Sequence, residues 1–406
     1  MEPLLAAVRS GDARAIHALL EAGAAPDATD EHGTPVLCLA VDAFDVEVVE
    51  ALVMSVRLDH VAPDGRTALL RAVDRGAHDI MEMLIAHGAA MRPTDPDGRD
   101  ALALARYWHE AGAAEVLYRR TGQSGPASRR TVASGDETTW EELSLGALTV
   151  RTGHSAILTT LEPRYGITAS FGELLARALA EPDVDHCVWW ATTYELQHRH
   201  DPAVWEAAAS LRARPAPLER YFGAEVLRLT HLFDESDEDT YDGPLTEVFL
   251  PWVAEEPDPR VVRALTAGLA EVRNPRAEQR LPALTRHPDA RVRQRAVGGL
   301  YCAVTEGQPD ALATVVERTA DVEAAVRRVA CTVLGAAPPR SAAASDVLAA
   351  RLSDVDEGVR VEAAARLALR DDPRGDDLLE ALAGSNEGSP HYWLLYDVHR
   401  HRHRGR

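Results

Sequence analysis

The feature of this 406-residue sequence that most restricts its fold is internal repetition, first with one pattern and then with another. Four alanines in similar contexts, Ala7, Ala40, Ala72 and Ala105, lie 33, 32 and 33 positions apart. A period of this length indicates one supersecondary unit per repeat, in which each unit buries its apolar face against its neighbours. We therefore expect residues 1–120 to form a solenoid of about four units.

Tight turns precede three of these units. Gly33, Gly65 and Gly98, in segments such as "PDGRT", suit turns that need a positive φ. The pattern resembles the ankyrin repeat over essentially all of residues 2–120, but the T-P-L-H core of that family reads "PVLC" at 35–38 and "TALL" at 67–70. The resemblance implies a degenerate, somewhat irregular ankyrin stack.

A second pattern runs from about residue 171 to the end of the chain. Val292, Val326 and Val359 are each followed four residues later by alanine and eight residues later by leucine, the spacing of one buried helical face. With segments such as "PDARVRQRAVGGL", this pattern resembles the short HEAT repeats common in bacteria, in about six copies. Acid and arginine pairs four residues apart, such as Asp289 with Arg293, have the spacing of helical ion pairs, which in HEAT families form ladders between repeats.

These patterns predict an all-α fold of two helical solenoids in tandem. Between the ankyrin-like repeats (1–120) and the HEAT-like repeats (171–406), we expect a Gly/Ser/Thr-rich linker at 121–137 and a non-repeating capping or transition segment at 138–170. The basic His/Arg tail, 399–406, is expected to fray. The acidic insert at 233–243 lacks the glycine that a calcium loop requires, because Asp242 stands at the sixth position of a loop that starts at Asp237.

Composition excludes several classes of function. The formal net charge is −21 and the sequence contains no lysine, so P-loop NTPases, protein kinases and Schiff-base enzymes are excluded. The four cysteines are scattered and no His/Cys set has ligand spacing, so we expect no metal and no cofactor. An acidic residue near the N-terminus, where a signal peptide is basic, and the lack of a long apolar run predict a cytoplasmic protein.

One stretch, "VDHCVWWATTYELQHRHD" at 184–201, concentrates reactive side chains. His186 and His198 lie twelve residues apart, or roughly 18 Å along a helix, so they cannot share a metal, and we expect solvated loop and cap histidines. Trp190, Tyr194 and His198 follow at four-residue steps and predict a stripe away from the buried face. Two interpretations stay open. The stripe either faces the concave surface of the solenoid or is buried as core beneath residues 138–170.

Solenoids usually hold other macromolecules, so we expect a non-enzymatic adaptor that binds proteins on the ankyrin fingers and on the HEAT concave face. An acidic finger row suits a partner with a basic surface, and one version is an inhibitor or immunity-type protein. The alternative is an enzyme similar to HEAT-repeat DNA glycosylases, with Trp189, Trp190 and Tyr194 around a damaged base. Net charges of −9 for 1–120 and −12 for 121–406 disfavour nucleic acid. The candidate finger contacts are Asp27, Asp30, Glu31, Asp64, Arg66, Asp95 and Asp97.

Overall fold

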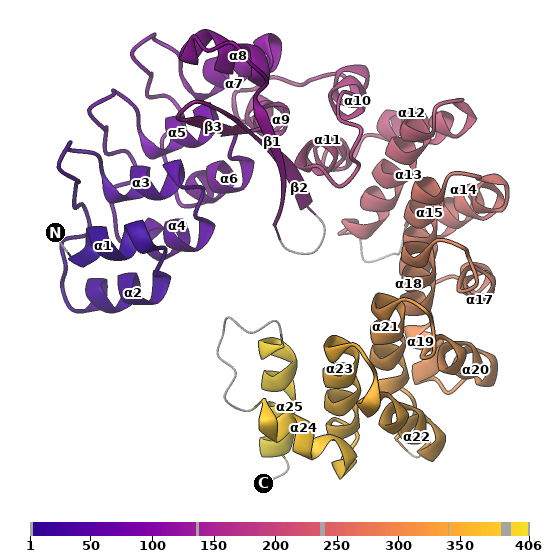
Figure 1. Ribbon diagram of the computed structural model, residues 1–406. Coiled ribbons are helices and arrows are strands. Elements are labelled where there is room, and N and C mark those ends of the chain that lie inside the picture. The colour runs from indigo at the N-terminus through magenta and orange to yellow at the C-terminus, as the bar shows by residue number, and fades with distance from the viewer. Residues whose placement is uncertain (1–2, 135–137, 236–239, 340, 383–390, 405–406) are drawn as a thin grey trace. The chain divides into compact units, whose positions relative to one another are not determined.

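Three turn glycines lie between successive helix pairs in the first part of the chain. Gly33, Gly65 and Gly98 have φ values of 81°, 80° and 77°, which the sequence predicts. The computed structural model describes residues 3–134, 138–235, 240–339, 341–382 and 391–404 (Figure 1). The chain divides into two compact units, Met1–Arg199 and His200–Arg406.

Four helix pairs form the first part of unit 1. Four of these helices begin at a side chain that accepts a backbone N–H, as Asp45, Thr67 and Asp100 do for α4, α5 and α7. The helices are α1 (Pro3–Ser10), α2 (Ala13–Glu21), α3 (Val36–Asp42), α4 (Val46–Val53), α5 (Ala68–Arg75), α6 (His78–Ala86), α7 (Ala101–Ala111) and α8 (Ala113–Thr121).

An antiparallel sheet follows these helices. Its strands β1 (Ser128–Ser134), β2 (Thr138–Leu145) and β3 (Leu148–Arg151) are ordered β1-β2-β3, with Val132 opposite Trp140 and Leu143 opposite Val150. The expectation of a structureless linker at 121–137 is therefore wrong for residues 128–134, while residues 135–137 lie outside the described part. The all-α prediction holds for most of the chain but misses this sheet.

The sheet and helix α9 (His154–Arg164) share the core of the first four helix pairs. Leu143, Val150 and Leu158 belong to the same buried cluster as the side chains of α1 to α8. The end of α5 and strand β3 lie close together at Gly76, where a Cβ atom would lie 2.1 Å from the Arg151 carbonyl oxygen. The Arg151 guanidinium lies 4.4 Å from the Phe44 ring centroid and 4.5 Å from that of Trp140. Residues 138–164 thus cap the stack.

Two helices complete unit 1, α10 (Phe171–Leu179) and α11 (Cys187–Gln197). The Thr139 backbone N–H donates to the Asp185 carbonyl oxygen at 2.8 Å, which ties the start of α11 to the sheet. Ser170 starts α10 with a capping box completed by Glu173.

Unit 2 is built from two layers of helices. We call α13, α15, α18, α21 and α23 the second-helix layer, and Figure 1 shows them stacked side by side on the inner side of the curve that this unit follows. The predicted buried faces are confirmed, since Val292, Val326 and Val359 and their alanine and leucine partners are all buried. The layer comprises α13 (Pro217–Leu232), α15 (Pro259–Glu271), α18 (Ala290–Gly299), α21 (Ala324–Gly335) and α23 (Glu357–Ala368).

The other layer and the C-terminal helices cover the remaining apolar surface. In α25, Leu394, Leu395 and Val398 pack against the core of α23 and α24. Residues 399–404 continue α25 rather than fraying as expected, and 405–406 lie outside the described residues. These elements are α12 (Pro202–Ser210), α14 (Asp242–Glu255), α16 (Pro275–Glu278), α17 (Leu281–Leu284), α19 (Tyr301–Thr305), α20 (Pro309–Arg318), α22 (Ala342–Ala350), α24 (Asp376–Ala381), α25 (Tyr392–Arg404), and the 3₁₀ turns η1 (Leu211–Ala213), η2 (Arg351–Ser353) and η3 (Pro373–Gly375).

Candidate interaction surfaces

Three ring side chains form a row along α11. The Trp190 and Tyr194 ring centroids are 5.3 Å apart at an interplanar angle of 26°, and those of Tyr194 and His198 are 6.0 Å apart at 13°. The four-residue spacing places the side chains one above another on a helix. Trp190 is 46% exposed and Tyr194 38%, and His198 is also exposed. We call these three residues the ring row.

The opposite face of α11 explains why the ring row points outwards. Val188, Thr192 and Leu196 are buried and orient the helix. Of the two interpretations of the stripe, burial beneath residues 138–170 is wrong, because the side chains of that segment pack into the core of the first helix pairs. The neighbouring Trp189 is 3% exposed, and its indole Nε1 donates to the Glu181 carbonyl oxygen at 3.0 Å.

The histidines around α11 have different environments. His186 is the N-cap of the helix, and its Nδ1 accepts from the Val188 N–H, so that Nε2 bonds to the Thr152 hydroxyl at 2.9 Å. Burial lowers the pKa of His186 to about 4. This histidine is thus a buried cap and not the solvated residue expected, whereas His198 and His200 are exposed.

The acids of the predicted finger row all have partners within the chain. Asp30 accepts from the backbone of His32 and Thr34, and Asp95 accepts from the backbone of Asp97 and Arg99. Burial would raise the pKa of Asp95, but hydrogen bonds from Arg99 hold it below its ordinary value. These two aspartates therefore shape their own turns.

The other finger acids pair with arginines. Arg66 lies amid three carboxylates, 3.8 Å from Asp64, 3.9 Å from Asp74 and 3.8 Å from Asp95. The side chains of Glu31 and Asp97 nevertheless remain 64% and 68% exposed. The finger row is thus more nearly neutral than its sequence indicates. The acid–arginine pairs are Asp27 with Arg57, Glu31 with Arg9, Asp64 with Arg71, and Asp97 with Arg99.

Buried arginine–carboxylate pairs join helices of the second-helix layer to the turn that precedes the next helix of that layer. The guanidinium of Arg293 donates to both oxygens of Asp321, at 2.7 and 2.9 Å, and that of Arg327 bonds Asp354 with the same two distances. Arg220 pairs with Glu256 in the same way. The ladder between repeats is present, but the expected partners four residues away are wrong. Asp289 and Asp356 cap their helices, and Glu323 occupies the same N-cap position.

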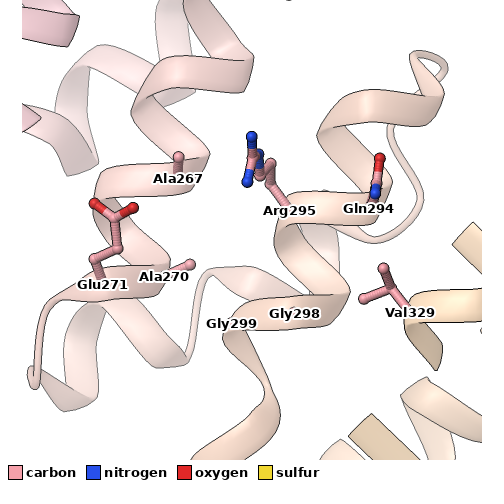
Figure 2. Close-up of a pocket in the computed structure, with 8 residues that line it drawn as sticks. All are labelled: Ala267, Ala270, Glu271, Gln294, Arg295, Gly298, Gly299 and Val329. Atoms are coloured by element: carbon pink, nitrogen blue, oxygen red, sulfur yellow. The ribbon is translucent and has the colours of Figure 1, made fainter. Parts of the chain in front are cut away.

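A pocket of about 310 Å³ opens between α15 and α18, and Figure 2 shows Arg295 extending into the space between these helices. Small residues create it, including Gly298 and Gly299. A Cβ at Gly299 would lie 2.5 Å from that of Ala270, so the helices meet closely at that point. The sequence analysis did not predict this pocket, because the pocket depends on small residues of two neighbouring helices. The glycine pair in "AVGGL" is the sequence feature that could have indicated it. The lining residues are Ala267, Ala270, Glu271, Gln294, Arg295, Gly298, Gly299 and Val329.

The acid in this pocket is partly neutralised. Glu271 accepts from the Arg228 guanidinium at 2.9 Å, and its second carboxylate oxygen has no hydrogen-bond partner within the described chain. Burial raises the pKa of Glu271 above its ordinary value.

The described residues do not form a metal site, and two of the buried cysteines are poor nucleophiles. Within the ranges that the structure describes, no three His, Cys, Asp or Glu residues are grouped to hold a metal ion. Cys38 and Cys331 are buried, and burial raises the pKa of each thiol to about 12. Neither is therefore a ready nucleophile.

The repeat patterns have direct counterparts among known families. A family model described as ankyrin repeats in three copies matches residues 37–124, and one described as HEAT repeats matches residues 246–335. Ankyrin repeats and HEAT repeats lie in one chain. The ankyrin match includes the fingers that hold Asp64 and Asp95, and the HEAT match includes the pocket between α15 and α18.

Individual relatives cover only part of the chain. It is 34% identical over 121 residues to the palmitoyltransferase AKR1 of Lachancea kluyveri, a match that includes 28% of this chain and 16% of the relative. The chain thus spans about a sixth of the length of this curated relative. The X-ray structure of YibA from Escherichia coli aligns with a TM-score of 0.43 at 16% identity, over 53% of this chain and 77% of that one. No helix within the described ranges is long and apolar enough to cross a bilayer.

Proposed function

We propose that this chain is a non-enzymatic scaffold that binds protein partners on two separate surfaces, the ankyrin fingers and the helices that carry the ring row. Repeat folds bury their apolar faces against neighbouring repeats and expose long surfaces, which typically hold other macromolecules. The observation that carries the proposal is the ring row, because adjacent exposed aromatic side chains form the kind of apolar surface that marks interaction sites.

The ring row has the character of a binding hot spot. Tryptophan and tyrosine contribute much of the energy of known interfaces, since they bury a large area at a small cost in conformational entropy. Trp190 is 46% exposed and Tyr194 is 38% exposed, and aromatic surface of this kind suits a partner arginine or an apolar side chain.

The finer part of the proposal concerns the partner's charge. Glu31 and Asp97 keep more than half of their side-chain surface exposed at the fingers, and the whole chain has a net charge of −21. Such a field speeds association with a basic protein surface. An acidic inhibitor or immunity-type protein is one form of this proposal, supported by charge alone.

The enzymatic alternative has less support. A base-excising enzyme would need Trp189 with Trp190 and Tyr194 around an extruded base. Trp189 is buried and donates its indole N–H to a backbone carbonyl, so it offers no face for stacking.

Affinity capture with paired variants tests the proposal. The chain and its Trp190→Ala/Tyr194→Ala variant are used as bait in a native lysate, with Tyr301→Ala as the control because Tyr301 is 49% exposed elsewhere. We expect a stoichiometric protein that the wild type and the control retain and the double variant loses. Equal retention by all three baits would contradict the role of the ring row.

A further inference from the structure

Three buried histidines stand at the N-terminal ends of helices in unit 1. His78 and His154 are the first residues of α6 and α9, and His186 is the N-cap of α11. All three are buried, and each ring forms a hydrogen bond to a residue of another segment of the unit. A positive charge is unfavourable at this end of a helix, because the N-terminal end of the helix dipole is itself positive. These positions therefore favour neutral histidine.

His186 forms hydrogen bonds that only a neutral ring can form. Its Nδ1 accepts the Val188 backbone N–H at 3.3 Å, so the single ring hydrogen is on Nε2, which donates to the Thr152 hydroxyl at 2.9 Å. The same hydroxyl oxygen accepts the Glu141 backbone N–H at 3.0 Å, which connects the ring to strand β2. A second ring proton would occupy Nδ1, and two N–H groups would then face each other. Protonation therefore removes the cap of α11.

The charged groups around His186 do not compensate for this loss. Glu181 and Asp183 favour the charged ring, the former with Oε2 3.9 Å from the ring Nε2, whereas His78 opposes it. Burial outweighs the two acids and lowers the pKa of His186 to about 4. Burial also raises the pKa of Glu181, so this acid loses its charge early as the pH falls. The titratable groups around the ring and the adjacent Cys187 thiol are Glu181 and Asp183 of the turn before α11, and His78, Asp79 and Glu82 of α6.

The first turn of α11 carries part of the ring row. Trp190 follows His186 by four residues, and its ring stacks on that of Tyr194 at 5.3 Å. Later in the helix, Thr192 and Leu196 are fully buried and hold the remaining turns in the core. Loss of the cap should therefore free the first turn, including Trp190, while the rest of the helix stays packed.

We propose that His186 is a proton-sensitive latch for the ring row, which holds the first turn of α11 in place while neutral and releases it when protonated. The inference rests on the proposed scaffold function, because it assigns a control to the surface that carries that function. In the released state the ring lies in water and has the ordinary histidine pKa of about 6.5. The released state therefore binds the proton more tightly than the latched one, and acid favours release.

Linkage gives the size of the effect. With a pKa of about 4 for His186 in the latched state and about 6.5 in the released state, the ratio of released to latched chains should rise roughly twentyfold from pH 7 to pH 5.

The native cysteines of the full chain can report this release through labelling with 4,4′-dithiodipyridine, which reacts with thiols in mild acid. Cys187 is buried at the start of α11, Cys38 and Cys331 are buried in α3 and α21, and Cys302 is exposed. Peptide mass spectrometry follows each thiol, and the rate at Cys187 is divided by the rate at Cys302 to remove the pH dependence of the reagent.

We expect this rate ratio to rise roughly twentyfold from pH 7 to pH 5, while Cys38 and Cys331 stay protected. Equal acceleration at Cys38 would show that unit 1 unfolds as a whole, and it would overturn the latch. This comparison needs no variant.

Two histidine variants test the assignment to His186. His186→Asn retains a side chain that caps helices but does not titrate, so its rate ratio should be the same at pH 7 and pH 5. His87→Asn is the matched control, since His87 is an exposed histidine at the end of α6, and it should show the full rise. Circular dichroism at pH 7 checks that both variants are folded. A rise in His186→Asn as large as in the wild type would contradict the role of this ring.

The labelling needs no partner, so the latch and the scaffold function fail independently. Release at Cys187 without any protein captured through the ring row would contradict the scaffold function and still support the latch. A captured partner, with Cys187 labelled no faster at pH 5 than at pH 7, would overturn the latch and leave the scaffold function in place.

Discussion

Two adjacent tryptophans on α11 have opposite environments, so their substitutions should have different effects on stability. Trp189 is 3% exposed and Trp190 46%. Trp189→Ala should cost about 3–5 kcal/mol of unfolding free energy, because it leaves a large cavity. Trp190→Ala should cost about 1 kcal/mol or less, as for most surface positions. Chemical denaturation measures both, and a larger loss for Trp190→Ala would show that its ring is core.

Buried histidines predict how unit 1 responds to acid. Burial lowers the pKa of both His154 and His186 to about 4, below the ordinary histidine value of about 6.5. Between these values the unfolded chain binds more protons than the folded one, so stability is full above about pH 6.5 and falls as the pH drops towards 4. Unfolding free energies at pH 7 and pH 5 should differ, and His186→Asn, which keeps a capping residue, should reduce the difference. A pH-independent wild type would contradict the burial of these rings.

The finger acids show where residue-level prediction from sequence stops. Their positions and their turn glycines were predictable, because both recur with the repeat. Their neutralisation was not, since the arginines that bond Asp27 and Glu31 lie 30 and 22 positions away and meet them only in the stack.

At the scale of elements, the buried ladder predicts the strongest charge dependence. Arg327→Met would remove the bidentate partner of the buried Asp354 and leave it the Asp356 N–H and Arg351 at 4.0 Å, which should cost about 3 kcal/mol. Arg286→Met breaks an exposed pair with Glu317 and should cost about 1 kcal/mol or less. Urea unfolding compares the two variants. Equal effects would mean that the ladder contributes no more than a surface ion pair.

The helices of this protein are more predictable from its sequence than the strands. The second-helix layer was predictable because valine, alanine and leucine recur at helical spacing in each copy. Strand β1, "SRRTVAS", has little alternation of apolar and polar residues, so its composition predicts a linker. It becomes a strand because it pairs with residues 138–144 of β2. The partners of the buried arginine ladder were predicted wrongly for a related reason. Helical spacing points to an acid four residues away in the same repeat, whereas Arg327 forms its bidentate pair with Asp354 of the next repeat.

At the scale of the whole molecule, the cap defines the fragment that folds. Trp108 stacks on His154 of the cap at 4.4 Å and donates to Asp74, which Arg120 also bonds. Residues 1–199 should therefore fold alone, whereas residues 1–120 lose the cap and should melt at a markedly lower temperature. Circular dichroism of both fragments checks this. Equal melting temperatures would favour the independent ankyrin stack and the 121–137 boundary that the sequence alone predicts.

The central claim, that a partner protein binds at the ring row, is tested most directly by site-specific photocrosslinking. A photoreactive phenylalanine derivative replaces Trp190 in the full chain, and the same residue at Tyr301, equally exposed, serves as the control. The account predicts a discrete crosslinked protein from position 190 and none from position 301. No crosslink at position 190, or the same products from both positions, would contradict it.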